Sequence, residues 1–512
     1  MLLADLIDVS ARVAATRSRN DKTALVADLL SRAEPDEVEV VATYLSGVPR
    51  QRRTGLGHRS LRDLPPPATS PTLTVADVDE ALSTVATAAG TGSRAVRASA
   101  VSSLFGRATP EEQTYLTALV LENLRQGALD SILLDAIAKA SGIGAKEVRR
   151  AAMYLPDSGA LAHLALHGGG AEALAAVDMV VGRPVRPMLA SSAPALAEAL
   201  AKAGPSAYVD RKLDGIRVQV HRDGEEVRVY TRSLDDVTDR LPEVVAAARS
   251  LPSEQVVLDG EVIALGPDGR PRPFQETASR TSSSADVAGA AARTPLSVVF
   301  FDLLNLDGQS LVDLPLSSRL ARLAALAPES LLVPRVQPAT VEEGQDFFES
   351  TLTAGHEGVV VKAADGPYEA GRRGAGWIKV KPRLTLDLVV IGVEWGSGRR
   401  RGLLSNIHLA ARDPDRQLSE TGFVMLGKTF KGMSDEMLAW QTERFTELAD
   451  GPTDGWVVRV RPEQVVEIAL DGLQTSTRYP AGLALRFARV LRYRDDKTAA
   501  EADTIETVRG LA

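Results

Sequence analysis

The first third of the chain has the hydrophobic periodicity of α-helices. The tetrapeptide Thr-Pro-Glu-Glu at residues 109–112 is a capping box with proline at the first helical position, and apolar residues then recur on one face. A second periodic run carries Leu133 and Ile137 and ends near Gly142. Residues 55–72 hold three consecutive prolines and few large apolar side chains, which predicts a loop within an otherwise helical region.

The pattern changes after Met188 to short apolar or alternating runs that predict β-strands. In the middle of the chain these runs are residues 207–211, 216–221, 226–231, 256–264, 296–303, 358–362 and 376–381, with helical stretches such as 241–251 between them. Towards the C-terminus they are residues 387–394, 405–411, 422–426, 456–461 and 464–469, interrupted by a helix over about 434–449. Short strands with one helix in so short a segment favour a small β-barrel of the OB type.

These patterns predict a multidomain protein with three parts. The expected domains are an all-α N-terminal domain at residues 1–175, an α+β domain at 176–383 and a C-terminal OB-fold β-barrel at 384–512. A chain of 512 residues is also too long for one ordinary hydrophobic core, which agrees with a division into several domains.

The composition excludes several classes of protein. Cysteine is absent, so disulfides, thiolate zinc sites and cysteine nucleophiles are excluded, and a reducing cytoplasm is the expected compartment. Acidic residues interrupt the N-terminus, which does not resemble a signal peptide, and no uninterrupted apolar stretch approaches the roughly 18 residues of a membrane span. A net charge of −8 does not indicate a nucleic-acid-binding protein, but screening makes local charge clusters matter more than the total.

The hexapeptide Lys212-Leu-Asp-Gly-Ile-Arg217 lies between two strand-like runs. An exposed lysine is protonated at neutral pH, whereas a lysine that is partly buried beside cations can act as a nucleophile. A surface lysine on a strand is the more common explanation for such a short motif taken alone. The residues that accompany Lys212 therefore decide between the two interpretations.

Two carboxylate motifs follow at strand ends. Asp259-Gly-Glu261 stands between two apolar strands, and Glu357 opens the run Glu357-Gly-Val-Val-Val-Lys362. Glu261 and Glu357 could hold a magnesium ion beside phosphates, although each acid alone is more often a turn residue.

Several cations complete the set of candidate residues. Lys379 and Lys381 are spaced by two, which places both on one face of a strand; either an anion lies between them or they protect an edge strand. Arg232 stands at another strand end. Residues 478–497 form a basic stretch with interleaved aromatic residues, which suits phosphate contact or a solvated surface.

Taken in order, these motifs resemble those of the covalent nucleotidyltransferases, and most closely the ATP-dependent DNA ligases. The matching residues are Lys212-Leu-Asp-Gly-Ile-Arg217, Arg232, Asp259-Gly-Glu261, Phe301-Asp302, Glu357-Gly-Val-Val-Val-Lys362, Lys379-Val-Lys381 and Arg494-Asp-Asp-Lys497. The N-terminal segments Ser46-Gly47, Leu124-Arg-Gln-Gly127 and Gly182-Arg-Pro-Val-Arg-Pro-Met-Leu189 are similar to the helical DNA-binding domain of larger ligases.

The resemblance implies a role for each matched residue. Lys212 would attack ATP and carry AMP, while Phe301 would stack on adenine. Asp210 occupies the position where the family usually has a glutamate that contacts the base, so this chain departs from the family there. The other implied roles are ribose or phosphate binding by Arg217, Glu261, Arg232, Arg373, Lys379 and Lys381, metal binding by Glu261 and Glu357, and pyrophosphate engagement by Arg494 and Lys497. Arg372 is an alternative to Arg373.

The expected function is sealing of nicks in duplex DNA with ATP and Mg²⁺ or Mn²⁺, in replication, repair or recombination. A monomer without membrane contact, recruited by a sliding clamp or repair proteins, is expected. Two alternatives stay open: an RNA ligase or capping-type guanylyltransferase built on the same lysine motif, and a DNA-binding scaffold without activity. Labelling of the protein by ATP separates a scaffold from an enzyme.

Overall fold

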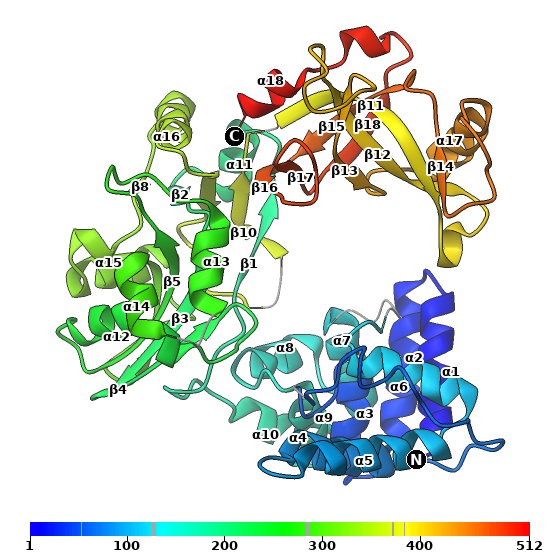
Figure 1. Ribbon diagram of the computed structural model, residues 1–512. Helices are drawn as coiled ribbons and strands as arrows, with labels where there is room; N and C mark the ends of the chain where they lie inside the picture. The colour runs from blue at the N-terminus through cyan, green and yellow to red at the C-terminus, as the bar shows by residue number, and fades with distance from the viewer. Residues whose placement is uncertain (53, 125–129, 283–285, 371–372, 383, 512) are drawn as a thin grey trace. The chain divides into compact units, whose positions relative to one another are not determined.

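The computed structural model describes residues 1–512 apart from positions 53, 125–129, 283–285, 371–372, 383 and 512. The chain divides into two compact units, Met1–Lys379 and Val380–Ala512 (Figure 1). The first unit contains the helical region and the α+β region, and the second is rich in strands. The fold class expected from the sequence is confirmed, whereas the domain boundaries at residues 175 and 383 stay predictions.

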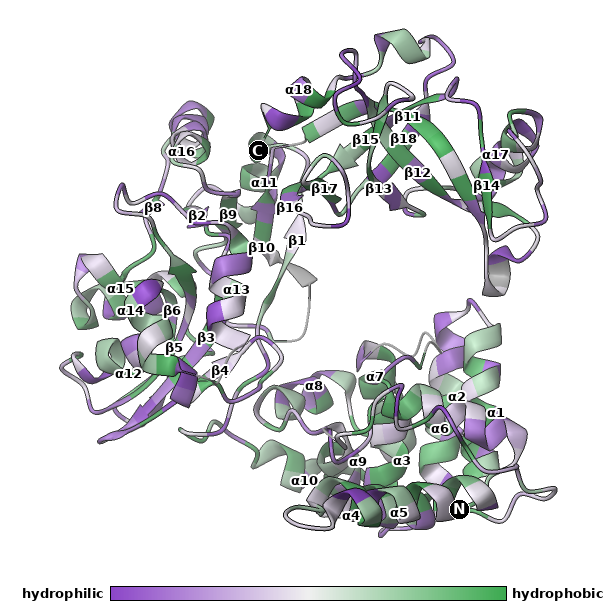
Figure 2. Cartoon of the chain, in the orientation of Figure 1, coloured by the Kyte–Doolittle hydropathy of each residue, from purple (hydrophilic) through white to green (hydrophobic). Residues whose placement is uncertain are grey.

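The regular elements of the N-terminal region are all helices in its described part, apart from one isolated bridge between Leu2 and Thr74. Thr109 caps its helix as expected, with the side chains and backbone of Thr109 and Glu112 bonded reciprocally. Buried leucine and valine residues from most of the helices form one hydrophobic core, and hydrophobic and polar residues alternate around α1 and α2 (Figure 2). The helices are α1 (Leu3–Ala15), α2 (Arg19–Arg32), α3 (Val38–Leu45), α4 (Val75–Thr87), α5 (Ser93–Arg107), α6 (Pro110–Val120), α7 (Asp130–Ser141), α8 (Ala145–Tyr154), α9 (Ser158–Leu166) and α10 (Gly170–Ala175).

Two five-stranded sheets form the framework of the α+β region. The first has the order β1-β10-β9-β2-β8, from β1 (Leu189–Ser192), β10 (Arg373–Val380), β9 (Gly358–Lys362), β2 (Tyr208–Lys212) and β8 (Arg335–Val336). The second has the order β4-β3-β5-β6-β7, from β4 (Glu226–Thr231), β3 (Ile216–Asp223), β5 (Gln255–Ala264), β6 (Leu296–Leu306) and β7 (Gln309–Ser310). The seven strands predicted in this region are all present.

Helices accompany both sheets. Valine, leucine and alanine residues of α12 and α15 share a hydrophobic core with strands β3 to β6. The helical segments are α11 (Leu196–Ala203), η1 (Thr238–Arg240), α12 (Pro242–Arg249), α13 (Phe274–Ser282), α14 (Val287–Arg293), α15 (Leu316–Leu326), η2 (Glu329–Leu331) and α16 (Val341–Thr353). In the described residues no helix of either unit combines the length and apolarity that crossing a bilayer requires.

The second unit is built on a sheet with the order β13-β12-β11-β15-β18, and β14 also pairs with β11. Its strands are β11 (Leu384–Trp395), β12 (Leu404–Arg412), β13 (Phe423–Thr429), β14 (Val457–Arg459), β15 (Val465–Leu470), β16 (Gly472–Thr475), β17 (Leu483–Arg486) and β18 (Arg489–Tyr493). Its helical segments are η3 (Gly398–Arg400), α17 (Asp435–Glu447), η4 (Ala499–Glu501) and α18 (Ile505–Arg509). The five predicted strands are confirmed, and β16, β17 and β18 add to them, so part of the basic stretch after residue 478, namely Arg486, Arg489 and Arg492, lies on strands of this unit.

Candidate active site

Lys212 is the last residue of β2 and lies opposite Gly358 at the start of β9. Its ammonium group forms an ion pair with Glu357 and approaches the carbonyl oxygen of Leu213 at 3.5 Å. The backbone N–H of Glu357 donates to the carbonyl oxygen of Lys212 at 3.2 Å, so backbone and side chains both hold these residues together. The Lys212 side chain is 24% exposed, and is therefore partly buried but still reachable by a small molecule.

The turn after Lys212 carries the chain from the first sheet to the second. Gly215 in this turn packs directly against β5. A Cβ atom at this position would lie 2.3 Å from the carbonyl oxygen of Val262 and 2.9 Å from Cγ of Glu261. Only a residue without a side chain fits this close approach, which gives the glycine of the hexapeptide a steric reason.

Replacing Gly215 by alanine is therefore expected to push the turn away from β5 and to displace Lys212. A displacement of about 1 Å can slow a reaction about 100-fold, so we expect self-adenylylation by ATP to fall by that order. The measurement is the single-turnover rate of AMP transfer to the protein. Gly57→Ala is the matched control because no atom lies within 4 Å of its added Cβ. Equal rates in both variants would contradict the steric role of Gly215.

Glu261 of β5 is the second acid beside Lys212. Burial raises the pKa of its carboxyl to about 7, and Glu357 adds to this rise. Lys212, Arg217 and the backbone N–H of Gly215 act in the opposite direction, which shows that these groups surround the carboxylate. The structure thus brings both expected metal-binding acids to the nucleophile. Within the described residues, no group of three or more His, Asp or Glu side chains is arranged to hold a metal ion.

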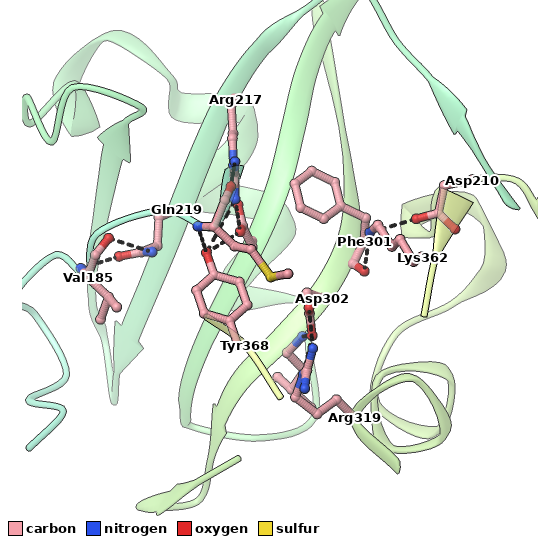
Figure 3. Close-up of polar contacts among 12 residues, drawn as sticks. Val185, Asp210, Arg217, Gln219, Phe301, Asp302, Arg319, Lys362 and Tyr368 are labelled. Carbon is pink, nitrogen blue, oxygen red and sulfur yellow. Dashed lines mark hydrogen bonds and ion pairs between the residues drawn. The ribbon is translucent and has the colours of Figure 1, made fainter. Parts of the chain in front are cut away.

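Arg217 of β3 is fixed by a buried polar network (Figure 3). Its guanidinium donates to both carboxylate oxygens of Asp259 and to the carbonyl oxygen of Met188. The hydroxyl of Tyr368 accepts from Arg217 at 3.2 Å and from the backbone N–H of Met188 at 3.0 Å, and donates to Asp259 at 2.7 Å. This network ties β3 and β5 to the loop before β10.

Phe301 of β6 lies beside this network, half-buried. Its ring is perpendicular to that of Trp377, with the centroids 5.7 Å apart. The ammonium nitrogen of Lys362 lies 4.4 Å from the Phe301 centroid and 4.2 Å from the Trp377 centroid, and the Arg217 guanidinium lies 5.5 Å from that of Phe301. The ring is therefore a partly exposed aromatic surface flanked by two cations.

Asp302, the neighbour of Phe301, forms an ion pair with Arg319 of α15. The two carboxylate oxygens accept from Nε and Nη2 of Arg319 at 2.8 and 2.9 Å, and both side chains are completely buried. Nη1 of Arg319 also donates to the carbonyl oxygens of Leu314 at 2.6 Å and Gly366 at 3.2 Å. This pair anchors β6 to the loop that bears Tyr368.

Asp210 is buried and fully engaged by two cations. Nη2 of Arg335 donates to Oδ2 at 2.7 Å and Nε donates to Oδ1, while the Lys362 ammonium lies 2.7 Å from Oδ2. Burial alone would raise the pKa of this carboxyl, but Arg335 and Lys362 outweigh it and hold the pKa below its usual value. The family resemblance predicts that Asp210 contacts the base, and no sequence pattern predicts Arg335 or Lys362 as its partner.

The remaining candidates are more scattered. Arg232 is exposed in the turn after β4. Lys379 is half-buried in β10, which ends at Val380, and Lys381 belongs to the second unit, where it lies 3.5 Å from Asp471. The strand therefore includes Lys379 but ends before Lys381, so the prediction that both lysines lie on one face of one strand does not apply to Lys381. The backbone of Arg373 pairs with Leu189, whereas its side chain and residue Arg372 lie outside the described residues.

Arg494 and Lys497 come together in the second unit. Oδ2 of Asp387 lies 3.0 Å from Nη1 of Arg494 and 2.6 Å from the ammonium nitrogen of Lys497. Arg494 also forms an ion pair with Asp496 at 2.7 Å. The two cations expected to bind pyrophosphate are thus held by one carboxylate.

Five residues that the structure places in or around this candidate site were not singled out from the sequence. Asp259 begins one of the quoted motifs and Lys362 ends another, while Trp377 stands two residues before Lys379. The neighbouring motifs therefore indicated these three positions. Arg335 and Tyr368 come from short or irregular segments without a motif, and only the folded structure brings them to the site.

Models of one protein family match most of the chain. They are described as DNA ligase N terminus, ATP dependent DNA ligase domain and ATP dependent DNA ligase C terminal region, and match residues 57–138, 187–381 and 400–497 respectively.

Named relatives are similar over their full length. A probable DNA ligase of Beutenbergia cavernae is 61% identical over 520 residues, and DNA ligase B of Mycobacterium tuberculosis is 56% identical over 513 residues; each match covers 100% of both chains. A solved structure named Pmar-Lig_Pre has a TM-score of 0.62 at 18% identity and covers 96% of this chain and 99% of that one. At this identity the structural likeness supports the fold alone.

Proposed function

Because the chain belongs to the family of ATP-dependent DNA ligases, we propose that Lys212 is the residue that carries AMP from ATP to a nicked DNA end. The observation that supports this most is the meeting of Lys212 with Glu357 and Glu261 where the chain crosses between two sheets. A nucleophile beside two acids, with an aromatic ring nearby, suits attack on a nucleoside triphosphate.

In the first step, the unprotonated amine of Lys212 attacks the α-phosphorus of ATP. The N–P bond forms, the bond to the β-phosphate oxygen breaks, pyrophosphate leaves and the amine loses its proton. The Lys212 nitrogen is held in an ion pair with Glu357, so the Glu357 carboxylate must move away from this nitrogen before it can attack.

Two further transfers complete the reaction. An oxygen of the DNA 5′-phosphate attacks the phosphorus of the lysine-bound AMP, and the P–N bond breaks as the amine takes up a proton. The 3′-hydroxyl then attacks the activated 5′-phosphorus, the strands join and AMP leaves. Each transfer places charge on phosphate oxygens, which fixed cations stabilise.

The remaining site residues receive binding roles. Phe301 stacks on adenine, since its ring is partly exposed, and Arg217 binds the ribose and phosphate region from its fixed position. Phosphate contacts are assigned to Arg232, Lys379, Lys381 and Arg373, and pyrophosphate would replace Asp387 as the partner of Arg494 and Lys497.

Glu261 and Glu357 have the carboxylate oxygens that would bind a magnesium ion. Carboxylate oxygens are the ligands that Mg²⁺ takes, and it commonly uses only one or two of them together with phosphate oxygens and water. The half-buried Glu261 carboxyl, whose pKa desolvation raises, gains a counter-ion in such a site. When bound, the cation would stabilise negative charge on the reacting phosphates.

Addition of Mg²⁺ is therefore expected to raise the Tm of the first unit, even without ATP. The rise should be about 1 °C for each kcal/mol of binding free energy in a unit of this size, because a ligand that binds only the folded state stabilises it. Differential scanning fluorimetry of the wild type, Glu261→Gln and Glu357→Gln measures this, with Mn²⁺ in parallel. A rise of the same size in both variants would show that these acids do not bind the ion.

The substrate of the family is DNA, and nicked duplex DNA is the form we propose. A monomer recruited by a sliding clamp or repair protein is part of the proposal. The absence of cysteine supports the cytosol as the place of action.

The test of this function combines labelling and sealing. The full chain is incubated with ATP labelled in the α-phosphate, and then with matched nicked DNA and nicked RNA duplexes. We expect labelling by ATP and joining of nicked DNA. Labelling by GTP instead of ATP would indicate a capping-type enzyme, preference for the RNA nick would indicate an RNA ligase, and no labelling would indicate a scaffold.

A further inference from the structure

Tyr208, Asp210 and Lys212 are spaced by two along β2, so their side chains point to the same face of the strand. Asp210 therefore lies on the same face as the proposed nucleophile, about 7 Å away along the strand. A free carboxylate at this position would repel the phosphates of an incoming nucleotide. The groups that surround Asp210 decide whether this happens.

Arg335 covers Asp210 from the neighbouring strand. The two residues are directly opposed in the β2–β8 pairing, and the guanidinium spans both carboxylate oxygens. Its carbon also lies 5.7 Å from the centroid of the Tyr208 ring, so Arg335 extends over two side chains of the same face. The planar fork of arginine matches a carboxylate in this bidentate manner.

Lys362 adds a second cation from β9. Its ammonium lies 2.7 Å from Oδ2 of Asp210 and donates to the carbonyl oxygen of Phe301 at 3.3 Å (Figure 3). Asp210 is 2% exposed, and three of the roughly four lone-pair directions of its carboxylate are occupied. Two cations and one anion leave the cluster with one excess positive charge.

We propose that Arg335 and Lys362 withhold Asp210 from the base of the nucleotide, and that Asp210, Arg335 and Lys362 act together as positioning residues that give the β2 face a net positive charge towards the triphosphate. This inference rests on the proposed role of Lys212. It replaces the adenine contact that the family resemblance implies for Asp210, and it assigns a function to Arg335, which no motif identifies.

The proposal predicts different behaviour from a base contact for two quantities: the preference for ATP over ITP, and KM for the triphosphate. If Asp210 accepted the exocyclic amine of adenine, removing its charge would reduce the preference for ATP over ITP, which carries an oxygen in place of the amine. If Asp210 is withheld, that preference stays, and loss of Arg335 raises KM for the triphosphate because positive charge is lost.

The experiment measures KM and kcat of self-adenylylation with ATP and with ITP in the full chain. For Arg335→Met we expect KM for ATP to rise about tenfold with kcat within about twofold, whereas Arg335→Lys, which keeps the charge, stays close to the wild type. For Asp210→Asn we expect the ATP-to-ITP ratio of kcat/KM to stay within about twofold of the wild type. The exposed Asp365→Asn is the matched control.

A fall of tenfold or more in the ATP-to-ITP ratio of Asp210→Asn would overturn the proposal, as would an unchanged KM in Arg335→Met. If Asp210→Asn does not fold, Arg335→Met decides: freeing Asp210 must not lower the ATP-to-ITP ratio. Absence of labelling in the wild-type chain would instead refute the proposed function itself, so the two failures are distinguishable.

Discussion

Replacing Lys212 by alanine is expected to abolish labelling of the protein by ATP. The alanine side chain has no nucleophile, and the described neighbours of Lys212 are acids and backbone groups that cannot form a phosphoramidate. Sealing of a nick that already carries AMP on its 5′-phosphate should survive in part, since that step needs the 3′-hydroxyl and phosphate-binding groups but no lysine adduct. The measurements are α-phosphate labelling from ATP and single-turnover sealing of a pre-adenylylated nick.

Lys202→Ala provides the matched control. Lys202 lies on α11 of the same region, is half exposed and pairs with Glu198 on its own helix. We expect this variant to keep both activities. Retention of ATP-dependent sealing in Lys212→Ala would show that another residue carries AMP.

Replacing Arg319 by methionine is expected to destabilise the first unit by about 3–5 kcal/mol. The substitution keeps most of the side-chain volume but leaves the completely buried Asp302 without its counter-ion. It also removes the Arg319 hydrogen bonds to the carbonyl oxygens of Leu314 and Gly366, of which Gly366 keeps a donor in the backbone N–H of Leu316. The free energy of unfolding of this unit, followed in urea by tryptophan fluorescence, measures the effect. Trp377, 5% exposed in this unit, lies beside Phe301 and reports on the same region.

Arg322→Met is the control for this prediction, because Arg322 lies one turn away on α15 and makes an exposed hydrogen bond to Gln309. A change within about 0.5 kcal/mol is expected there. If Arg319→Met were equally harmless, the buried pair would have no structural role.

The sequence predicted those parts of the fold that depend on local pattern. The strand ending at Lys212 and the strand after Glu357 follow from their apolar runs, and the order of the motifs predicts that both residues belong to one site, which agrees with the ion pair between them. The strands β16, β17 and β18 were not predicted, because each is short and its pairing depends on partners distant in the chain.

The environment of Asp210 shows what local pattern cannot supply. Arg335 is 125 residues away in sequence and reaches Asp210 only because β8 pairs with β2. Tyr368 is likewise 109 residues from Asp259, in a loop with no periodic pattern. Such contacts follow from the arrangement of strands in the sheet, which single-residue spacing does not specify.

The most direct test of the account is to locate the AMP on the protein. The full chain is incubated with ATP and Mg²⁺, digested under neutral conditions that preserve the P–N bond, and mapped by tandem mass spectrometry. We predict AMP on the peptide that contains Lys212, bonded to the side-chain nitrogen of that residue. AMP on a different lysine, with the Lys212 peptide unmodified, would contradict the central claim.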